Sequence, residues 1–330
     1  MSQTTQNTAA MIIQQLYSNT LLESFPEQLM DASMLFNDRT SEFPEGDQLN
    51  INQIGDITLS PYNENTPLDF SAIDTSRIYL QITEYDQDAW YITDKLKEDA
   101  RSQIPGLVAS RTRKSSEAFR QKLVSDILTT QAQQAIGDDN QINNQPHRIV
   151  ASGGVDGARV MTLDDLRLMK LSFDEANIPA TGRVAFVDPT VEFALNDLAQ
   201  VVTADNPRFE GIVNTGFADR NSMQFIKNIY GWDIMTTTML PRVGAESITS
   251  YDFSDPTTPV ARTTGERGVA NMFMYIGDDE GKPFMGVIRK QPTAGSKRND
   301  DLQRDEYWGV SRWGFALQRP ETLGVVLTDK

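Results

Sequence analysis

The chain of 330 residues contains no cysteine and a single histidine, His147. Without thiols it can form no disulfide, no thiolate metal site and no cysteine nucleophile. A serine-histidine-aspartate triad would have His147 as its only possible base, and no nucleophile-elbow sequence accompanies it. Residues for nucleophilic catalysis are therefore scarce, which favours a structural or binding role over an enzymatic one.

Long hydrophobic runs are also missing. The one apolar-leaning stretch near the N-terminus, residues 9–16, is about half as long as a membrane-spanning helix needs to be. No lysine or arginine precedes Arg39, so the basic segment that begins a signal peptide is absent. We expect a soluble chain that is not exported, with a length typical of about two domains.

Positive charge is rare in the first part of the chain. Residues 1–94 hold two basic residues against 15 acidic ones, a balance of −13, whereas the remaining residues hold 28 basic and 31 acidic groups, a balance of −3. Within this nearly neutral part, one short segment gathers Arg111, Arg113, Lys114, Arg120 and Lys122. In a monomer this pattern is ordinary solvated surface, but in an assembly it provides complementary faces that steer subunits together.

The hydrophobic pattern predicts an α+β fold with no repeating βαβ unit and no sequence repeat. Strands are predicted at 50–59, 76–85, 184–187, 269–276, 284–288, 307–317 and 323–327, and a turn and strand within 230–241. Helices are predicted at 86–100, 106–135 and 162–176, and from Pro189 onward. Thr162 and Asp165 have the spacing of a capping box at the start of the third helix.

Two segments carry a resemblance to a known family. Residues 174–195, DEANIPATGRVAFVDPTVEFAL, combine a helix end, a short buried strand and an Asp-Pro pair that opens another helix. Residues 230–241, YGWDIMTTTMLP, form a turn and strand closed by proline. Both resemble the matching stretches of tailed-phage major capsid proteins, which have the HK97-type fold, and the order of elements along nearly the whole chain is similar to that family.

The resemblance implies a division of the chain into five parts. These are an N-terminal arm (1–44), an extended E-loop hairpin (45–85), a P domain with a long spine helix (86–160), most of an A domain (161–300) and C-terminal strands that return to the P domain (301–330). By the same resemblance the subunit self-assembles into hexamers and pentamers of an icosahedral head around double-stranded DNA. It would work with a separate scaffolding protein, since no room for a fused one precedes the arm, and with a portal and a cement protein.

The resemblance also implies where the subunit acts. It would assemble in the host cytoplasm and end in the virion capsid. Residues 1–94 contain no lysine, so a lysine-to-asparagine crosslink from this E-loop has no donor and the shell is expected to be noncovalent. Two alternatives stay open. An encapsulin-like compartment would enclose an enzyme instead of a genome, and a soluble hydrolase would depend on His147.

We predict that subunits touch through opposite charges. The acidic candidates lie in the arm and E-loop: Glu42, Glu45, Asp47, Asp56, Glu64, Asp69 and Asp74. The basic candidates lie on the spine helix: Arg111, Arg113, Lys114, Arg120 and Lys122. Contact with packaged DNA through these cations would be nonspecific.

No catalytic, cofactor or metal site is predicted. Residues 153–157 are rich in glycine but lack phosphate-loop spacing, and Gly281-Lys282-Pro283 lacks the Ser or Thr that should follow the lysine. The acidic pairs at 138–139 and 278–279 lack calcium-loop spacing, and Asp164-Asp165 is better explained by a helix N-terminus.

Overall fold

The computed structural model describes residues 32–43, 45–54, 64, 75–99, 104–134, 141–142, 145–155, 158–195, 224–252 and 255–329. The chain divides into two compact units. Among the described residues, unit 1 comprises Asp88–Ala118 and Ala294–Gly309, and unit 2 comprises the rest. No helix in the described ranges is both long and apolar enough to cross a membrane.

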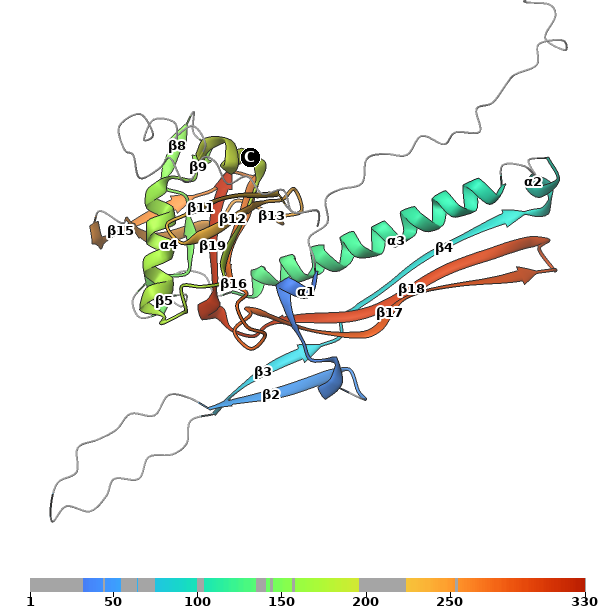
Figure 1. Ribbon diagram of the computed structural model, residues 1–330, viewed down its shortest axis with the longest axis horizontal. Helices are drawn as coiled ribbons and strands as arrows, with labels where there is room; N and C mark the ends of the chain where they lie inside the picture. The colour runs from blue at the N-terminus through green and yellow to red at the C-terminus, as the bar shows by residue number, and fades with distance from the viewer. Residues whose placement is uncertain are drawn as a thin grey trace, which may run out of the picture. The chain divides into compact units, whose positions relative to one another are not determined.

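The largest sheet of unit 2 has seven strands in the order β11-β12-β10-β16-β19-β7, with β13 paired to β16 (Figure 1). Its strands are β7 (Arg148–Val150), β10 (Arg183–Val187), β11 (Gln224–Ile229), β12 (Trp232–Thr236), β13 (Arg242–Val243), β16 (Gly268–Tyr275) and β19 (Leu323–Asp329). Every residue of β10 and β16 is buried, as expected for strands covered on both faces. The predicted strands at 184–187, 269–276 and 323–327 are confirmed.

Successive residues of these strands point to opposite faces of the sheet, and each face builds its own core. On one face, Ala185, Val187 and Val326 pack with Phe173 of helix α4 (Leu163–Glu175). On the other face, Val184, Phe186 and Val325 join a second cluster that includes Leu128 and Trp313. Helix α4 begins with the predicted capping box, in which Thr162 and Asp165 bond each other's backbone N–H groups.

The motif at 230–241 folds as a hairpin. Tyr230 and Gly231 connect β11 to β12 and both have positive φ, 52° and 86°. Two left-handed residues in succession match the right-handed twist of the paired strands, which is why glycine is favoured there. The predicted turn and strand are confirmed, and so is the helix that opens at Pro189, which the structure describes at 189–195.

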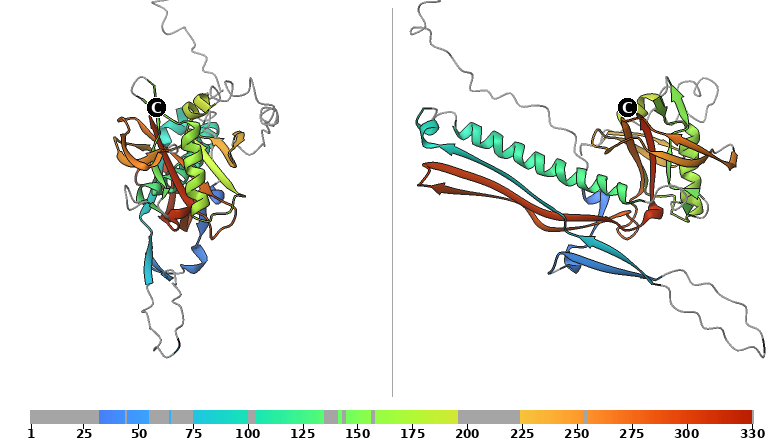
Figure 2. Two further views of the ribbon diagram at one scale, coloured as in Figure 1. Left: turned by 90° about the vertical axis from the view of Figure 1, so that its left-hand side faces the viewer. Right: turned by 180° about the vertical axis from the view of Figure 1, so that it is seen from behind.

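The four-stranded sheet has the order β1-β17-β18-β4. Its members are β1 (Phe36–Asp38), β4 (Glu84–Thr93), β17 (Phe284–Asn299) and β18 (Arg304–Leu317). Strands β4, β17 and β18 each continue from unit 2 into unit 1, as does helix α3 (Ile104–Thr129). In the ribbon views α3 runs along β4 (Figures 1 and 2).

The remaining elements are short. Two-stranded hairpins are formed by β2 (Gln48–Ile54) with β3 (Thr75–Gln81), β5 (Gln141–Ile142) with β6 (Gln145–Pro146), β8 (Gly153–Val155) with β9 (Ala158–Val160), and β14 (Ser247–Asp252) with β15 (Asp255–Thr263). The helical pieces are α1 (Ala32–Leu35), α2 (Asp94–Asp99), η1 (Thr40–Glu42), η2 (Thr130–Gln133) and η5 (Pro320–Thr322). The α+β class is confirmed.

Two element predictions were wrong. Residues 86–93 are strand, not helix, because β4 pairs with β18 in the sheet, where Trp90 stacks on Tyr307 of β18 with ring centroids 4.2 Å apart. Strand β17 runs far beyond the predicted end at residue 288. Its partner β1 reaches only Gly286, so the following part of β17 needs no ladder bonds on that side and tolerates Pro292.

Candidate subunit-contact surface

In unit 1 the cations of α3 have partners within their own chain. The guanidinium of Arg111 donates from Nη2 to Oδ1 of Asp88 on β4 at 2.7 Å, and the hydroxyl of Ser115 donates to the same carboxylate. One turn along, Lys114 pairs with Glu117 at 3.1 Å. Asp88 and α3 are brought together because β4 alternates, which turns every second side chain toward the helix.

In unit 2 the last cation of the group is also paired. Lys122 Nζ donates to Asp126 at 2.6 Å and to Glu84 of β4 at 3.3 Å. The indole N–H of Trp313 on β18 donates to the other oxygen of Asp126 at 2.9 Å. Of the predicted cations, Arg111, Arg113 and Arg120 are exposed, and Lys114 and Lys122 are half-buried.

Three carboxylates meet around Lys122. One oxygen from each of Glu84, Asp86 and Asp126 lies within 4.8 Å of the others. Partial burial raises the pKa of Asp86 above its ordinary value, opposed by Lys122 and helped by the two neighbouring carboxylates. Oxygen donors in this number could hold a hard cation, but the ammonium of Lys122 already provides a positive charge among them. Lys122 thus offsets one of the three carboxylates through its contacts with Glu84 and Asp126.

The acidic candidates are only partly described. Glu45 and Asp47 are exposed just before β2, Glu64 is exposed, and Glu42 pairs with Arg39 at 2.6 Å. Asp56, Asp69 and Asp74 lie outside the described residues. Their contacts with another subunit stay a prediction.

Sequence reasoning missed a polar network at the turn between β17 and β18. Arg298 binds the carboxylate of Asp94 on α2, Lys97 binds Asp305, and the backbone N–H of Asp94 donates to the carbonyl of Gln303 at 3.0 Å. The hydrogen bonds that Arg298 donates to the carboxylate of Asp94 lower the pKa of Asp94 to about 2. The alternation of signs in KRNDDLQRDE, residues 297–306, was the available signal.

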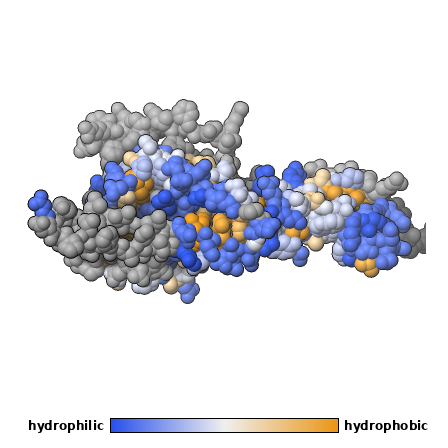
Figure 3. All heavy atoms as spheres, turned by 90° about the horizontal axis from the view of Figure 1, so that it is seen from below, coloured by the Kyte–Doolittle hydropathy of each residue, from blue (hydrophilic) through white to orange (hydrophobic). Residues whose placement is uncertain are grey.

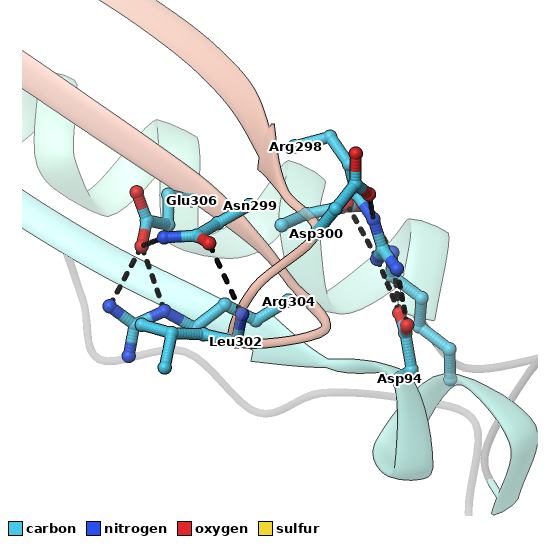
Figure 4. Close-up of polar contacts among 9 residues, drawn as sticks. Asp94, Arg298, Asn299, Asp300, Leu302, Arg304 and Glu306 are labelled. Atoms are coloured by element: carbon cyan, nitrogen blue, oxygen red, sulfur yellow. Dashed lines mark hydrogen bonds and ion pairs between the residues drawn. The ribbon is translucent and has the colours of Figure 1, made fainter.

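Figure 4 shows that this network has two sides. Arg298 points to Asp94 on α2, whereas Glu306 is bound by Arg304 and Asn299. Arg304 Nε lies 2.8 Å from Glu306 Oε1, and Asn299 Nδ2 lies 3.0 Å from the same oxygen. Ion pairs thus fix both faces of the hairpin end in unit 1.

The residues considered for catalysis have structural roles. His147 is fully buried and stacks on Phe173 with ring centroids 5.9 Å apart. Its Nδ1 lies 3.2 Å from the carbonyl oxygen of Gln145, and its Nε2 has no hydrogen-bond partner among the described residues. Burial lowers the pKa of His147 below its ordinary value, so the ring stays neutral at pH 7.

The other motifs that resembled sites also serve the fold. Lys282 is buried and donates to the carbonyl of Ser33 at 2.8 Å and to Asp279 at 2.7 Å. Asp278 accepts from the backbone N–H of Glu280 at 2.9 Å, which closes a turn. The first three residues of the glycine-rich stretch, Gly153–Val155, form strand β8, and the acidic pair at 138–139 lies outside the described residues.

We predict that acid destabilises the subunit through His147. Because its folded-state pKa is lowered, the unfolded chain binds more protons below about pH 6.5, so stability falls as the pH drops through that range. In His147→Phe this dependence disappears. The difference in free energy of unfolding between wild type and variant should change by at most about 1.4 kcal/mol per pH unit between pH 7 and 5. Urea unfolding at several pH values measures it, and parallel curves for the two proteins would contradict it.

A match to a protein family identifies the class of protein to which the chain belongs. A family model described as "Phage capsid protein" matches residues 76–327. The chain belongs to the phage capsid protein family. It is therefore a structural major capsid protein, not an enzyme, and the hydrolase alternative was wrong. Membership also implies self-assembly into capsid oligomers and a place in the virion capsid.

Solved structures agree on the fold of this capsid protein. The capsid structure of cyanophage P-SCSP1u matches with a TM-score of 0.68 and 14% identity, covering 99% of this chain and 96% of that one. A structure from Mycobacterium phage Che8 matches with a TM-score of 0.63 and 16% identity, covering 96% and 97%. The SrpI encapsulin from Synechococcus elongatus matches with a TM-score of 0.57 and 10% identity, covering 98% and 94%. None of the curated proteins matches.

Proposed function

We propose that this capsid protein forms the hexamers and pentamers of an icosahedral phage head that encloses double-stranded DNA. Its five parts are then the arm (1–44), the E-loop (45–85), the P domain with α3 as its spine helix (86–160), most of the A domain (161–300) and the returning C-terminal strands (301–330). The observation that carries the proposal is the acidic balance of residues 1–94, −13, against the five cations gathered within residues 111–122 of α3. Oppositely charged faces favour encounter of a chain with its own copies.

In this proposal the acidic arm and hairpin of one subunit lie over α3 of its neighbour. Arg111, Arg113 and Arg120 are exposed on α3, and Arg111, Lys114 and Lys122 also pair with carboxylates of their own chain. The contact is noncovalent, because residues 1–94 contain no lysine and the chain has no cysteine. Its strength should therefore depend on ionic strength.

Reversing three charges on α3 tests the contact. The variant Arg111→Glu, Arg113→Glu and Lys114→Glu is expected to lose assembly, because carboxylates would then face the acidic hairpin. Assembly is measured by negative-stain electron microscopy and sedimentation, and folding of the unassembled subunit by circular dichroism. Shells formed as readily as by wild type would refute the contact.

A control separates this effect from the ion pair that the triple variant also breaks. Asp88→Asn removes the carboxylate bound by Arg111 but leaves the cations of α3 in place. We expect Asp88→Asn to assemble, with an effect of at most about 1 kcal/mol on stability, because exposed ion pairs contribute little. Loss of assembly in both variants would assign the effect to the subunit's own fold.

The partners follow from the same proposal. A separate scaffolding protein directs assembly in the host cytoplasm, a portal occupies one vertex, a cement protein reinforces the shell, and the packaged DNA is touched without sequence specificity. An encapsulin-like compartment is the second candidate, favoured by the likeness to the SrpI encapsulin. The contents of purified particles decide between them: nuclease-protected DNA indicates a phage head, and an enclosed protein indicates a compartment.

A further inference from the structure

Unit 1 has almost no hydrophobic core of its own. Among its described residues, Ile92 is the one buried large apolar side chain, and the three core clusters include none of its residues. A compact piece of this size cannot bury enough apolar surface to be stable by packing alone. Its ion pairs are exposed and contribute little each. Its strands and α3 are continuous with unit 2, and cover from outside the chain would add the apolar burial that unit 1 lacks.

The same unit carries most of the exposed hydrophobic surface. Eight large apolar side chains are exposed in the described part of the chain, and five of them belong to unit 1: Tyr91, Leu96, Leu107, Leu302 and Trp308. Tyr91 is 58% exposed and Leu302 is 56% exposed. Figure 3, which views the chain from the side of β17 and β18, shows hydrophobic patches interrupting a hydrophilic surface.

The two exposed aromatics lie on one face of the sheet. Arg304 of β18 places its guanidinium carbon 4.5 Å from the ring centroid of Tyr91 on β4. Trp308 covers Gly295 of β17, where a Cβ would lie 2.6 Å from the indole ring. Along β18, residues 304, 306 and 308 share this face because side chains alternate. Tyr91 and Trp308 thus stand on the neighbouring strands β4 and β18, and Arg304 of β18 reaches across to the ring of Tyr91.

The helices cover the opposite face of the same strands. Asp88 on β4 is bound by Arg111 of α3, and Asp305 on β18 is bound by Lys97 of α2. Arg298 on β17 reaches Asp94 of α2 in the same way. Among the described residues of unit 1, α2 and α3 contact only the other face, so the face with Tyr91 and Trp308 is left uncovered by them and is distinct from the face that α3 contacts.

We propose that this uncovered face, carrying Tyr91, Arg304 and Trp308 with Leu302 at its turn, is a contact surface for a second copy of this chain. The proposal rests on the proposed function as a shell subunit. Tyrosine, tryptophan and arginine are the side chains most often found where protein contacts are strongest. Aromatic rings also bring large apolar area with few rotatable bonds.

Charge favours a second copy as the occupant. The strands on this face carry the cations Arg304 and Lys297 against the single carboxylate Glu306, which both of them bind. The chain as a whole has a net charge of −16, most of it in residues 1–94. A neighbouring copy therefore supplies carboxylates to a face that has a surplus of positive charge.

Footprinting of the wild-type chain tests the proposal without relying on a mutant that folds. The purified chain, with no other protein present, is labelled by hydroxyl radicals as unassembled subunit and as rings or shells, and labelling is read by mass spectrometry. We expect Tyr91 and Trp308 to lose most of their labelling on assembly, by about fivefold or more. Phe193, which is 79% exposed and belongs to unit 2, reports labelling at a site outside this face.

A pair of variants gives the second measurement. Tyr91→Ser with Trp308→Ser is expected to raise the concentration needed for assembly about tenfold or more, and Tyr91→Phe with Trp308→Phe is expected to restore it. Assemblies whose Tyr91 and Trp308 remain fully labelled would overturn this inference and leave the proposed function intact. A wild-type chain that never associates under any condition would overturn both.

Discussion

Replacing Arg148 with methionine is expected to destabilise the subunit by about 3–5 kcal/mol. Arg148 is buried, and its guanidinium binds both oxygens of Glu246, at 2.7 and 2.8 Å, and the side-chain oxygen of Gln131 at 2.6 Å. Removal of the cation leaves a largely buried carboxylate without its counterion. The lost contacts are those that join β7 to η2 and to the residue just before β14. Urea unfolding of the unassembled subunit at pH 7 measures it.

Arg242→Met is the matched control. Arg242 has an exposed side chain on β13, so the same change of residue type should alter the free energy of unfolding by less than about 0.5 kcal/mol. If Arg148→Met unfolds at the same urea concentration as Arg242→Met, the ion pair contributes nothing to stability. In that case the ion pair between Arg148 and Glu246 would serve only to orient β7 relative to β14.

Trp313→Ala is expected to cost about 3–5 kcal/mol, because it opens a cavity beside α3. Trp313 is 1% exposed and belongs to the cluster that contains Leu128 and Phe284. Trp313→Phe keeps most of the volume and removes the indole N–H that binds Asp126, so it should cost about 1–3 kcal/mol. Thermal unfolding followed by circular dichroism compares the two variants.

The order of these two effects is the test. If Trp313→Phe destabilised the subunit as much as Trp313→Ala, the hydrogen bond to Asp126 would dominate and the packing would not. If neither variant lowered the melting temperature, the attachment of α3 to β18 would not depend on this tryptophan.

The core of unit 2 could be predicted from the sequence because its signals are local. Val184-Ala185-Phe186-Val187 is a short apolar run bounded by Gly182 and Pro189, and the spacing of Thr162 and Asp165 marks a helix start directly. The strand at 86–93 was missed because Asp86 and Asp88 occupy the face that Trp90 and Ile92 continue, so the alternating pattern shows no run of apolar positions. Only the pairing with β18, more than 200 residues away, makes it a strand.

The charge contacts could not be predicted for the same reason. Arg111 and Asp88 are 23 residues apart, and Lys122 and Glu84 are 38 apart, so the sequence shows a basic segment without its carboxylates. Which carboxylates pair with the cations of α3 depends on which residues of β4 face the helix. A shift of β4 by one residue would turn the other set toward the helix.

The position of β19 has a consequence for synthesis. This strand, residues 323–329, lies between β16 and β7 in the large sheet, and it pairs with β7 in parallel and with β16 antiparallel. Among the described residues, β19 is the one strand paired with β7 in that sheet, so β7 joins it only after β19 has emerged from the ribosome. Folding of the sheet then waits for a contact between residues about 175 positions apart, Ile149 and Val326. A nascent chain that still lacks residues 323–329 therefore leaves these strand pairings open, and the cores on both faces of the sheet are completed only when that strand arrives.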